Sequence, residues 1–347
     1  MLKLGVIFGG QSSEYSVSLH SVASFLRAIH ADRYEIVKIG IDQNGQFYLY
    51  DGTIDEIEHD QWQSKAVKAA WVHKGIMALD GKNEIQELDC VFPVLHGKNG
   101  EDGCIQGLLE LMNIHYVGCD VMSSAISMDK EIMHILCDGA KIPCADYVCL
   151  KAYEENPSFE EIQKQIPLPW IVKPCNAGSS YGVHKVETKE EFESACKDAF
   201  FYDGRGKILV EKTIEGFEIG CAVMGNEKVF TGSIDEIEIT GGFFDFEGKY
   251  EMKGANIYCP ARIDENTFKR AQQLACQTFK AMNCCGMARV DMFVTPEKEV
   301  ILNELNTIPG LTATSRYPSM MKEAGIEFPE LIDQLIELAM QRTISQC

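Results

Sequence analysis

Short apolar segments alternate with helical segments through the first part of the chain, and glycine or polar turns separate them. Residues 4–8 form an apolar run that ends at two glycines, and the apolar residues that follow recur at helical spacing. Residues 34–41 and 89–95 have the composition of further strands, and the second run leads through a polar turn into a helical segment at 105–112. Strands that alternate with helices in this way predict a doubly wound parallel sheet.

The chain has 347 residues, which is enough for two or three packed units. Changes in pattern place three units at residues 1–122, 123–212 and 213–347. We expect an α/β fold with a Rossmann-like parallel sheet in the first unit and α+β arrangements in the other two, while residues 43–88 are expected only to decorate the first unit with strands and loops. The elements expected after the first boundary are helices at 130–137, 158–165, 266–282 and 329–340, and strands at 146–150, 170–174, 208–211, 287–294 and 299–305.

Charge and cysteine content exclude several classes of partner and location. The formal net charge of -20 argues against nucleic acid or an anionic membrane surface as a partner, because both attract basic patches. The 14 cysteines are scattered without a CxxC pair, which is typical of a reducing compartment. No apolar stretch reaches the length of a membrane span, and the N-terminal apolar run is too short for a signal peptide. We therefore expect a soluble, cytoplasmic protein.

Glu14 follows the first glycine turn and stands where the first helix begins. A carboxylate in this position is often a cap that the helix dipole favours. Beside a glycine-rich opening at the edge of a parallel sheet, it can also hold the ammonium group of a substrate. The pattern alone leaves both interpretations open.

Lys173 ends an apolar strand and precedes a loop of small residues at 175–182. The backbone N–H groups of such a loop can approach phosphate oxygens closely, and the lysine supplies positive charge. The order differs from a Walker A loop, because here the lysine comes before the glycines. A solvated hairpin is the alternative interpretation.

The strongest signal is a set of charged and polar residues inside two apolar C-terminal strands. Arg289 and Asp291 lie on one strand, and Glu304 and Asn306 lie on the next. Charged residues within apolar strands usually form ion pairs or have a functional role. Glu304 and Asn306 are two residues apart and therefore point to the same face, and with Asp291 they offer the oxygen ligands that a magnesium-phosphate site requires. A buried salt bridge with Arg289 is the alternative.

The segment at 307–312 predicts a tight turn directly after these strands. The N–H group of Gly310, together with Arg289, can stabilise an oxyanion. Ser315 and Arg316 follow as a possible carboxylate-binding pair.

Eight segments of the chain resemble, in their order, one family of enzymes, the D-alanine–D-alanine ligases of the ATP-grasp type. The resemblance extends over essentially the whole chain and implies an ATP-grasp fold with ATP held between the second and third units. Each segment alone is a modest signal, but chance similarity of all of them in order is implausible. The segments are GGQSSEYSVSL, FPVLHGKNGEDG, MDK, VKPCNAGSSYG, VEKTIEGFE, FFDFEGKY, ARVDMF and NELNTIPGLTATSRYP.

The resemblance implies which residues bind ATP and metal. Two lysines contact the nucleotide phosphates, a glutamate and an isoleucine line the adenine pocket, and a second glutamate meets the ribose. Two Mg²⁺ ions, or Mn²⁺ in their place, are implied as cofactors. The residues implied for ATP are Lys130, Lys173, Ser180, Glu211, Lys212, Ile214 and Glu218, and those implied for the metal are Asp291, Glu304 and Asn306.

The resemblance also implies how the amino-acid substrates are held. Glu14 orients the ammonium of the first D-alanine, Ser179 hydrogen-bonds Glu14 and Tyr250, and His96 lies near the same substrate. Lys249 reaches the transferring phosphate and, with Ser315, holds the carboxylate of the second substrate. The residues implied for catalysis are Glu14, Ser179, Tyr250, Arg289 and Gly310, and those implied for substrate binding are His96, Phe244, Lys249, Ser315 and Arg316.

The implied reaction joins D-alanine to a second D-amino acid for peptidoglycan precursor synthesis, through a D-alanyl-phosphate made from ATP. The glycine-flanked, aromatic-rich loop at 240–252 is expected to close over the site and exclude water. Relatives of this family are commonly homodimers, so a homodimer is expected.

The identity of the second substrate depends on two positions. Tyr250 disfavours D-lactate, since the ligases that use D-lactate lack this tyrosine. Arg316, in the run SRYP, resembles the vancomycin-resistance D-alanine–D-serine ligases, and a donor left unpaired without the serine hydroxyl would favour D-serine. If Arg316 instead pairs with an acid at the pocket rim, a housekeeping D-alanine–D-alanine ligase is the alternative. A non-catalytic nucleotide or D-amino-acid binding protein, and a ligase acting on another carboxylate, are the alternatives of a different kind.

Overall fold

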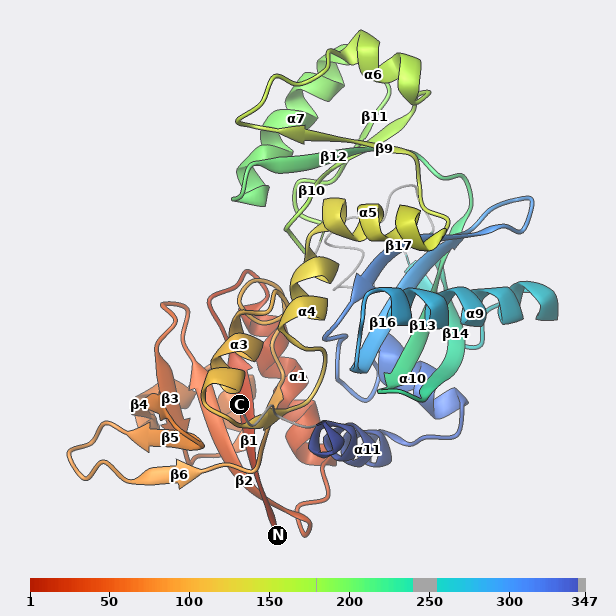
Figure 1. Ribbon diagram of the computed structural model, residues 1–347. Coiled ribbons are helices and arrows are strands. Elements are labelled where there is room, and N and C mark those ends of the chain that lie inside the picture. The colour runs from red at the N-terminus through yellow and green to blue at the C-terminus, as the bar shows by residue number, and fades with distance from the viewer. Residues whose placement is uncertain (179, 240–254, 343–347) are drawn as a thin grey trace.

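The computed structural model describes residues 1–178, 180–239 and 255–342. Three β-sheets follow one another along the chain, and helices pack around each of them (Figure 1). The expected α/β architecture is confirmed. The division into units at residues 1–122, 123–212 and 213–347 stays a prediction.

The first sheet has the strand order β6-β5-β4-β3-β2-β1-β7-β8. Its strands β1, β2, β7 and β8 pair in parallel, whereas β3 to β6 are joined by antiparallel pairing. Bounds are Leu2–Gly9 for β1, Tyr34–Ile41 for β2, Phe47–Tyr50 for β3, Val67–Val72 for β4, Gly75–Ala78 for β5, Ile85–Glu87 for β6, Cys90–Pro93 for β7 and His115–Tyr116 for β8.

The predicted parallel sheet is therefore present in only half of this sheet. The strands of residues 43–88 extend it on one side as an antiparallel meander. The connection from β2 to β3 is too short for the crossover that a parallel neighbour needs. Asp42 instead makes a tight turn there, because its Oδ1 atom accepts hydrogen bonds from the N–H groups of Asn44 and Gln46 at 2.9 Å each.

Helices cover the parallel half of the first sheet and connect it to the rest of the molecule. Helix α1 contacts β1, and a buried cluster joins its apolar face to residues of the C-terminal helices. The helices and the one 3-10 helix of this region are α1 (Tyr15–Ala28), α2 (Ile54–Glu58), η1 (Trp62–Lys65), α3 (Cys104–Leu111) and α4 (Val121–Met128).

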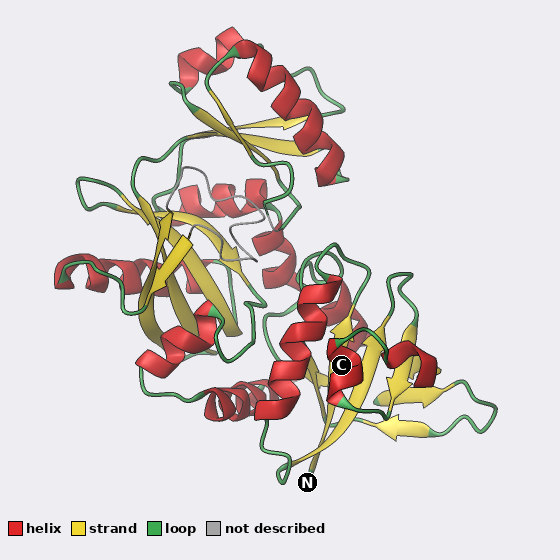
Figure 2. Ribbon diagram, turned by 180° about the vertical axis from the view of Figure 1, so that it is seen from behind, coloured by secondary structure: helices red, strands yellow, loops and turns green. Residues whose placement is uncertain are grey.

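The second sheet is antiparallel, with the order β11-β10-β12-β9. Its core surrounds the buried side chain of Trp170, against which Phe159 of α6 and Phe192 of α7 pack. Figure 2 shows the two helices of this region lying along the sheet. Bounds are Tyr147–Lys151 for β9, Trp170–Pro174 for β10, His184–Val186 for β11, Lys207–Lys212 for β12, Phe159–Gln165 for α6 and Lys189–Asp203 for α7.

The third sheet is also antiparallel, with the order β15-β14-β13-β16-β17. Helices α5 and α9 contribute to one buried core on this sheet, and α10 packs against β13 and β14. Bounds are Phe217–Gly225 for β13, Val229–Ile239 for β14, Ala255–Tyr258 for β15, Gly286–Val294 for β16, Val300–Asn306 for β17, Lys130–Ala140 for α5, Glu265–Ala281 for α9, Arg316–Glu323 for α10 and Phe328–Gln341 for α11.

Two connections between the sheets determine where a site can form. Met133 and Cys137 of α5 are buried in the core of the third sheet, although α5 precedes the second sheet in the chain. Helix α11 contacts β7 and β8 of the first sheet as well as β16 of the third. The three sheets therefore surround a shared region. Within the described part of the chain, no helix is long and apolar enough to cross a membrane.

Candidate active site

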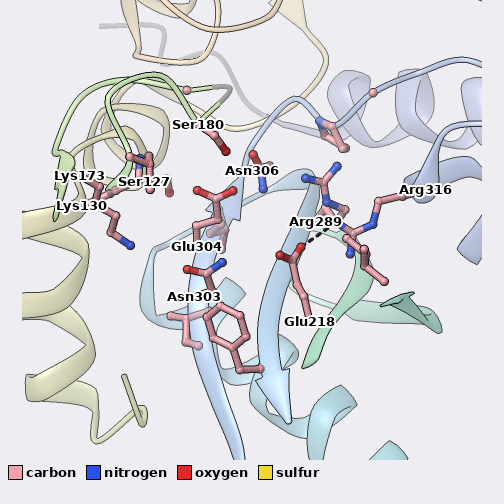
Figure 3. Close-up of a pocket in the computed structure, with 18 of the residues that line it drawn as sticks. Ser127, Lys130, Lys173, Ser180, Glu218, Arg289, Asn303, Glu304, Asn306 and Arg316 are labelled. Atoms are coloured by element: carbon pink, nitrogen blue, oxygen red, sulfur yellow. Dashed lines mark hydrogen bonds and ion pairs between the residues drawn. The ribbon is translucent and has the colours of Figure 1, made fainter. Parts of the chain in front are cut away.

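A cleft of about 1080 Å³ is lined by residues from all three sheets and their connecting loops. Loop residues of the second sheet and the start of α5 form one wall, and strands β16 and β17 form the opposite one (Figure 3). The N-terminal end of α1 closes one end of the cleft. Of the predicted site residues, Glu14, His96, Lys130, Lys173, Ser180, Glu211, Lys212, Ile214, Glu218, Arg289, Glu304, Asn306, Gly310, Ser315 and Arg316 line it.

Two buried lysines stand on the wall formed by α5 and the second sheet. The Nζ atom of Lys130, at the start of α5, donates to the carbonyl oxygen of Ala177 at 3.0 Å. Burial lowers the pKa of Lys130, and neighbouring Lys173 adds to that effect while Glu304 opposes it. Lys173 lies on β10, and its Nζ atom is 2.7 Å from Oε2 of Glu211. The two lysines give this wall the positive charge that a polyphosphate requires.

Glu211, on β12, joins Lys173 to a histidine that the sequence motifs do not single out. Its Oε1 atom is 2.8 Å from Nε2 of His134, so both carboxylate oxygens are engaged. Burial alone would raise the pKa of Glu211, but Lys173 and His134 hold it at about 2. Glu211 is therefore ionised at neutral pH and lies in the cleft between two basic groups.

Strands β16 and β17 carry the acidic wall. Their register sets Asp291 opposite Glu304 and Arg289 opposite Asn306. Glu304 and Asn306 line the cleft, as the alternation along a strand predicts. Asp291 does not line it, because its side chain is 1% exposed and lies behind its neighbours.

Asp291 is held by three donors. Arg289 donates to both of its oxygens, with Nε at 2.8 Å from Oδ1 and Nη2 at 2.8 Å from Oδ2. The amide nitrogen of Asn306 donates to Oδ2 at 2.8 Å, and Nη1 of Arg316 is 3.4 Å from Oδ1. The buried salt bridge with Arg289 that the sequence left open is thus present. Because the side-chain NH₂ group of Asn306 donates this hydrogen bond, the side-chain carbonyl oxygen of Asn306 can still bind another partner.

The donor set fits Mg²⁺ in its chemistry, since carboxylate and amide oxygens are the ligands that this ion prefers. Glu304 and Asn306 face the cleft, and Asp291 would join them only on exchanging one of its present bonds for the ion. Within the described residues, no group of three or more His, Cys, Asp or Glu side chains forms a ready-made metal site. The phosphates of a nucleotide supply the remaining oxygens in many magnesium sites.

Arg316 makes a different set of contacts from the one that the sequence predicted. Its Nε and Nη2 atoms donate to the two oxygens of Asp235 at 2.7 and 2.8 Å, and Nη1 donates to Glu218 at 3.0 Å. Carboxylates already hold this guanidinium in place, so the reason given above for D-serine, a donor with no other partner, is wrong. The interpretation of Arg316 as the partner of an acid holds, and three acids share it.

Glu218 also lines the cleft, and its Oε1 atom accepts a hydrogen bond from Arg316. Its predicted contact with a ribose stays untested. Asp235, which is 0% exposed on β14, is the acid that sequence reasoning missed. It lies 81 residues from Arg316 in the chain. The pairing of β13 with β14 and β16 sets Asp235 near Asp291, and the packing of α10 against β13 and β14 brings Arg316 to both.

Gly220 makes room for this ion-pair network. It pairs with Asp235 on one side and Asp291 on the other, so the guanidinium of Arg316 lies over it between two carboxylates. A Cβ atom at Gly220 would lie 2.5 Å from Nη2 of Arg316 and 2.7 Å from Oδ1 of Asp235. No side chain fits there without displacing a buried ion pair.

The variant Gly220→Ala is therefore expected to lower the free energy of unfolding by about 1–3 kcal/mol, because overpacking forces the network apart. Urea unfolding followed by circular dichroism measures this change. Gly139→Ala is the control, since a Cβ atom there meets nothing within 4 Å and α5 gains a better helix former. Equal stability of the two variants would show that the space above Gly220 is not needed.

Glu14 stands at the end of the cleft formed by the first sheet. It is 8% exposed and occupies the N-cap position of α1, although no side-chain capping hydrogen bond is present there. A Cβ atom at Gly97 would lie 2.3 Å from its Oε2 atom, and one at Gly178 would lie 3.2 Å from it. The glycines let loops of the first and second sheets approach the carboxylate closely.

His96 lies beside Glu14 in the same end of the cleft. Its Nε2 atom is 3.1 Å from Oγ of Ser21, and Nδ1 is 3.7 Å from Oε1 of Glu101. Burial opposes the charged imidazole, but Glu101 and Glu14 raise the pKa of His96 above its usual value. This end of the cleft therefore collects two carboxylates and an imidazole, a composition that suits a small cationic group.

The turn after β17 approaches the start of α10. The Oγ atom of Ser315, at the N-cap of α10, accepts from the N–H group of Thr312 at 3.1 Å. A Cβ atom at Gly310 would lie 3.0 Å from the same Oγ atom, so a larger residue would push the Ser315 side chain aside. Gly310 and Ser315 line the cleft as expected, whereas Ser179, Phe244, Lys249, Tyr250 and the loop at 240–252 lie outside the described residues.

Comparison with known proteins places these features in one family. The family described as D-ala D-ala ligase N-terminus matches residues 3–119, and the one described as D-ala D-ala ligase C-terminus matches residues 136–337. Together the two matches cover most of the chain.

Individual relatives match the chain over nearly its whole length. A D-alanine–D-alanine ligase of Oceanobacillus iheyensis is 42% identical, over 98% of this chain and 95% of that protein. The vancomycin C-type resistance protein VanC1 of Enterococcus gallinarum is also 42% identical, over 98% of each chain. The crystal structure of the VanG D-Ala:D-Ser ligase from Enterococcus faecalis superposes with a TM-score of 0.90 at 43% identity, covering 97% of this chain and 99% of that one.

Proposed function

The chain belongs to the D-alanine–D-alanine ligase family, whose members are ATP-dependent ligases, and from this we propose that it joins D-alanine to a second D-amino acid, with D-serine preferred. The observation that carries the proposal is the pair of facing walls in the cleft. Buried Lys130 and Lys173 stand on one wall, and Glu304 and Asn306 stand on the other. Such a site can hold a metal-bound triphosphate between positive and oxygen-donor groups.

In the proposed reaction, the carboxylate of D-alanine attacks the γ-phosphate of ATP and gives D-alanyl-phosphate and ADP. Lys130 and Lys173 stabilise the negative charge of the phosphates. Glu304, Asn306 and Asp291 would hold Mg²⁺, two ions being expected, and Mg²⁺ or Mn²⁺ neutralises charge on a transferring phosphoryl group. The amine of the second substrate then attacks the acyl carbon, and phosphate leaves.

The two ends of the cleft supply the groups for the two amino acids. Glu14 would hold the ammonium of D-alanine, and His96 lines the same cleft. Gly310 and Arg289 line the cleft near the start of α10, where an oxyanion of the tetrahedral intermediate would be stabilised by N–H donors. Ser315 is placed to meet the carboxylate of the second substrate.

The fixed position of the Arg316 guanidinium favours D-serine as the second substrate. The five N–H donors of a guanidinium exceed the four carboxylate contacts that Arg316 makes, and the residue lines the cleft. A donor that is held in place by Asp235 binds a hydroxyl without a cost for ordering the side chain. A site built around such a donor favours the substrate that carries the hydroxyl.

The test of the function is ADP release by the purified protein with ATP, Mg²⁺ and D-alanine, with and without D-serine, while the dipeptides are quantified. D-alanyl-D-serine as the main product supports the whole proposal. D-alanyl-D-alanine alone supports the ligase and refutes the serine preference. ADP release without any dipeptide, or no release at all, would refute the ligase function.

Substituting Arg316→Leu is expected to lower the ratio of D-alanyl-D-serine to D-alanyl-D-alanine by about 10-fold or more, because the hydroxyl loses its fixed donor. The two dipeptides are measured in one tube with both amino acids present. Their ratio is independent of how much enzyme is folded, so loss of stability does not distort it.

Arg342→Leu serves as the matched control for this variant. Its guanidinium is also hydrogen-bonded within the protein, since Nη2 donates to the carbonyl oxygen of Tyr116 at 2.7 Å, but Arg342 lies outside the cleft. The control should leave the ratio unchanged. An unchanged ratio in Arg316→Leu itself would contradict the role of this residue in choosing the second substrate.

A homodimer and a cytoplasmic location remain predictions that accompany this proposal. Light scattering of the purified protein tests the first, and fractionation of the source cells tests the second. Neither result alters the chemistry assigned to the cleft.

A further inference from the structure

His134 is a buried, charged group that the reaction as described does not use. It is 1% exposed, lines the cleft, and packs against the tilted ring of Tyr147 with ring centroids 4.5 Å apart. Its Nε2 atom is 2.8 Å from Glu211, whose other oxygen is bound by Lys173 at 2.7 Å. One carboxylate is therefore shared by two basic side chains from different elements, α5 and β10.

The proposed function brings the nucleotide phosphates to Lys173, whose single positive charge Glu211 already shares at 2.7 Å. A lysine whose charge is compensated by a carboxylate attracts a phosphate less strongly, so ATP binding favours a shift of the amine from Glu211 toward the nucleotide. A buried carboxylate that loses its only counter-ion is strongly destabilised. Glu211 avoids this because His134 remains as a second partner on the other oxygen.

We propose that His134 is a positioning residue for ATP binding, which neutralises Glu211 and thereby releases Lys173 to the phosphates. The inference rests on the proposed function, since it assumes that Lys173 contacts ATP. It assigns to His134 a role that depends on positive charge as well as on shape.

The surroundings of His134 support a charged imidazole. Glu211 faces it from β12, Lys173 from β10, Tyr147 from β9 and Cys144 from the loop before β9. Burial lowers the pKa of His134, but Cys144 and Glu211 outweigh this effect and raise it to about 9. The imidazole is therefore protonated at neutral pH, although Lys173 opposes its charge.

A purely structural role would depend on packing against Tyr147 and on one hydrogen bond. Two variants separate that role from the proposed one. His134→Gln keeps a donor for Glu211 but removes the charge, and His134→Lys keeps the charge but removes the ring. If charge matters, the lysine variant should resemble the wild type more than the glutamine variant does.

The experiment is titration calorimetry of MgATP into each protein without amino acids, followed by steady-state kinetics. His134→Gln is expected to raise the Kd for MgATP by about 10-fold, and His134→Lys by no more than about 3-fold. The KM for D-alanine should be unchanged, because Glu14 and His96 lie at the other end of the cleft. His30→Gln is the control, since its Nδ1 atom makes a 2.8 Å bond to Asp333 away from the cleft.

The outcomes distinguish this inference from the proposed function. If the wild type does not bind MgATP, the proposed function fails. If the wild type binds MgATP and His134→Gln binds it equally well, the inference is overturned while the function stands. Equal weakening by the glutamine and lysine variants would also overturn it, because shape rather than charge would then be decisive. Rescue by lysine alone supports it.

Discussion

Substituting Glu304→Gln is expected to lower the rate of dipeptide formation by on the order of 10³-fold while the protein stays folded. Glutamine has nearly the shape of glutamate but lacks the negative charge that binds a divalent ion. Glu304 lies on β17 in the wall that faces Lys130 and Lys173 (Figure 3). The substitution therefore removes a negative charge at the place where the transferring phosphoryl group would be held. Glu304 is only partly buried, so a neutral side chain of the same shape is expected to leave the fold intact.

Initial rates measured over a range of Mg²⁺ concentrations check this prediction. The variant should need more Mg²⁺ for half-maximal rate and should not reach the wild-type rate at saturation. Glu299→Gln is the matched control, because Glu299 is an exposed glutamate in the turn between β16 and β17. A Glu304→Gln enzyme with wild-type rate and Mg²⁺ dependence would remove this residue from the metal site.

Local patterns in the sequence were sufficient to locate the walls of the cleft. The apolar runs around Asp291 and Glu304 predicted two strands, which are present as β16 and β17. Alternation along β17 placed Glu304 and Asn306 on one face, and they both line the cleft. Such patterns depend on neighbours in the chain, so a single sequence reveals them.

Pairing between distant strands is what the sequence could not show. Asp235 and Asp291 flank Gly220 because β13 separates β14 from β16, and Arg316 reaches them because α10 packs against β13 and β14. Nothing in these segments specifies that arrangement. The antiparallel half of the first sheet was missed for a related reason. Strand composition predicted strands, but the direction of each partner follows from loop length and packing.

His134 shows a further limit of reading a sequence. On an amphipathic helix, one histidine among apolar neighbours has the appearance of a core residue. The contact with Glu211 links α5 to β12, 77 residues later in the chain. Its position four residues after Lys130, on the same helical face, is the one signal that would have drawn attention to it.

The second large effect is expected on stability. Arg316→Leu should lower the free energy of unfolding by about 3–5 kcal/mol, because Asp235 and Glu218 are left in the interior without their cation. Asp235 is 0% exposed, so water does not reach it to compensate for the lost ion pair. Urea unfolding followed by fluorescence measures the change, with wild type and variant compared at the same pH.

A double variant then separates the cost of an unpaired charge from the contribution of the pair itself. In Arg316→Leu with Asp235→Leu, the buried charge and its partner are both gone, and most of the lost stability should return. Continued instability of the double variant would show instead that Arg316 stabilises the fold through Glu218 or Asp291, its two other carboxylate partners. If stability returns but D-alanyl-D-serine does not, the arginine is retained for its action in the cleft, since the fold can be maintained without it.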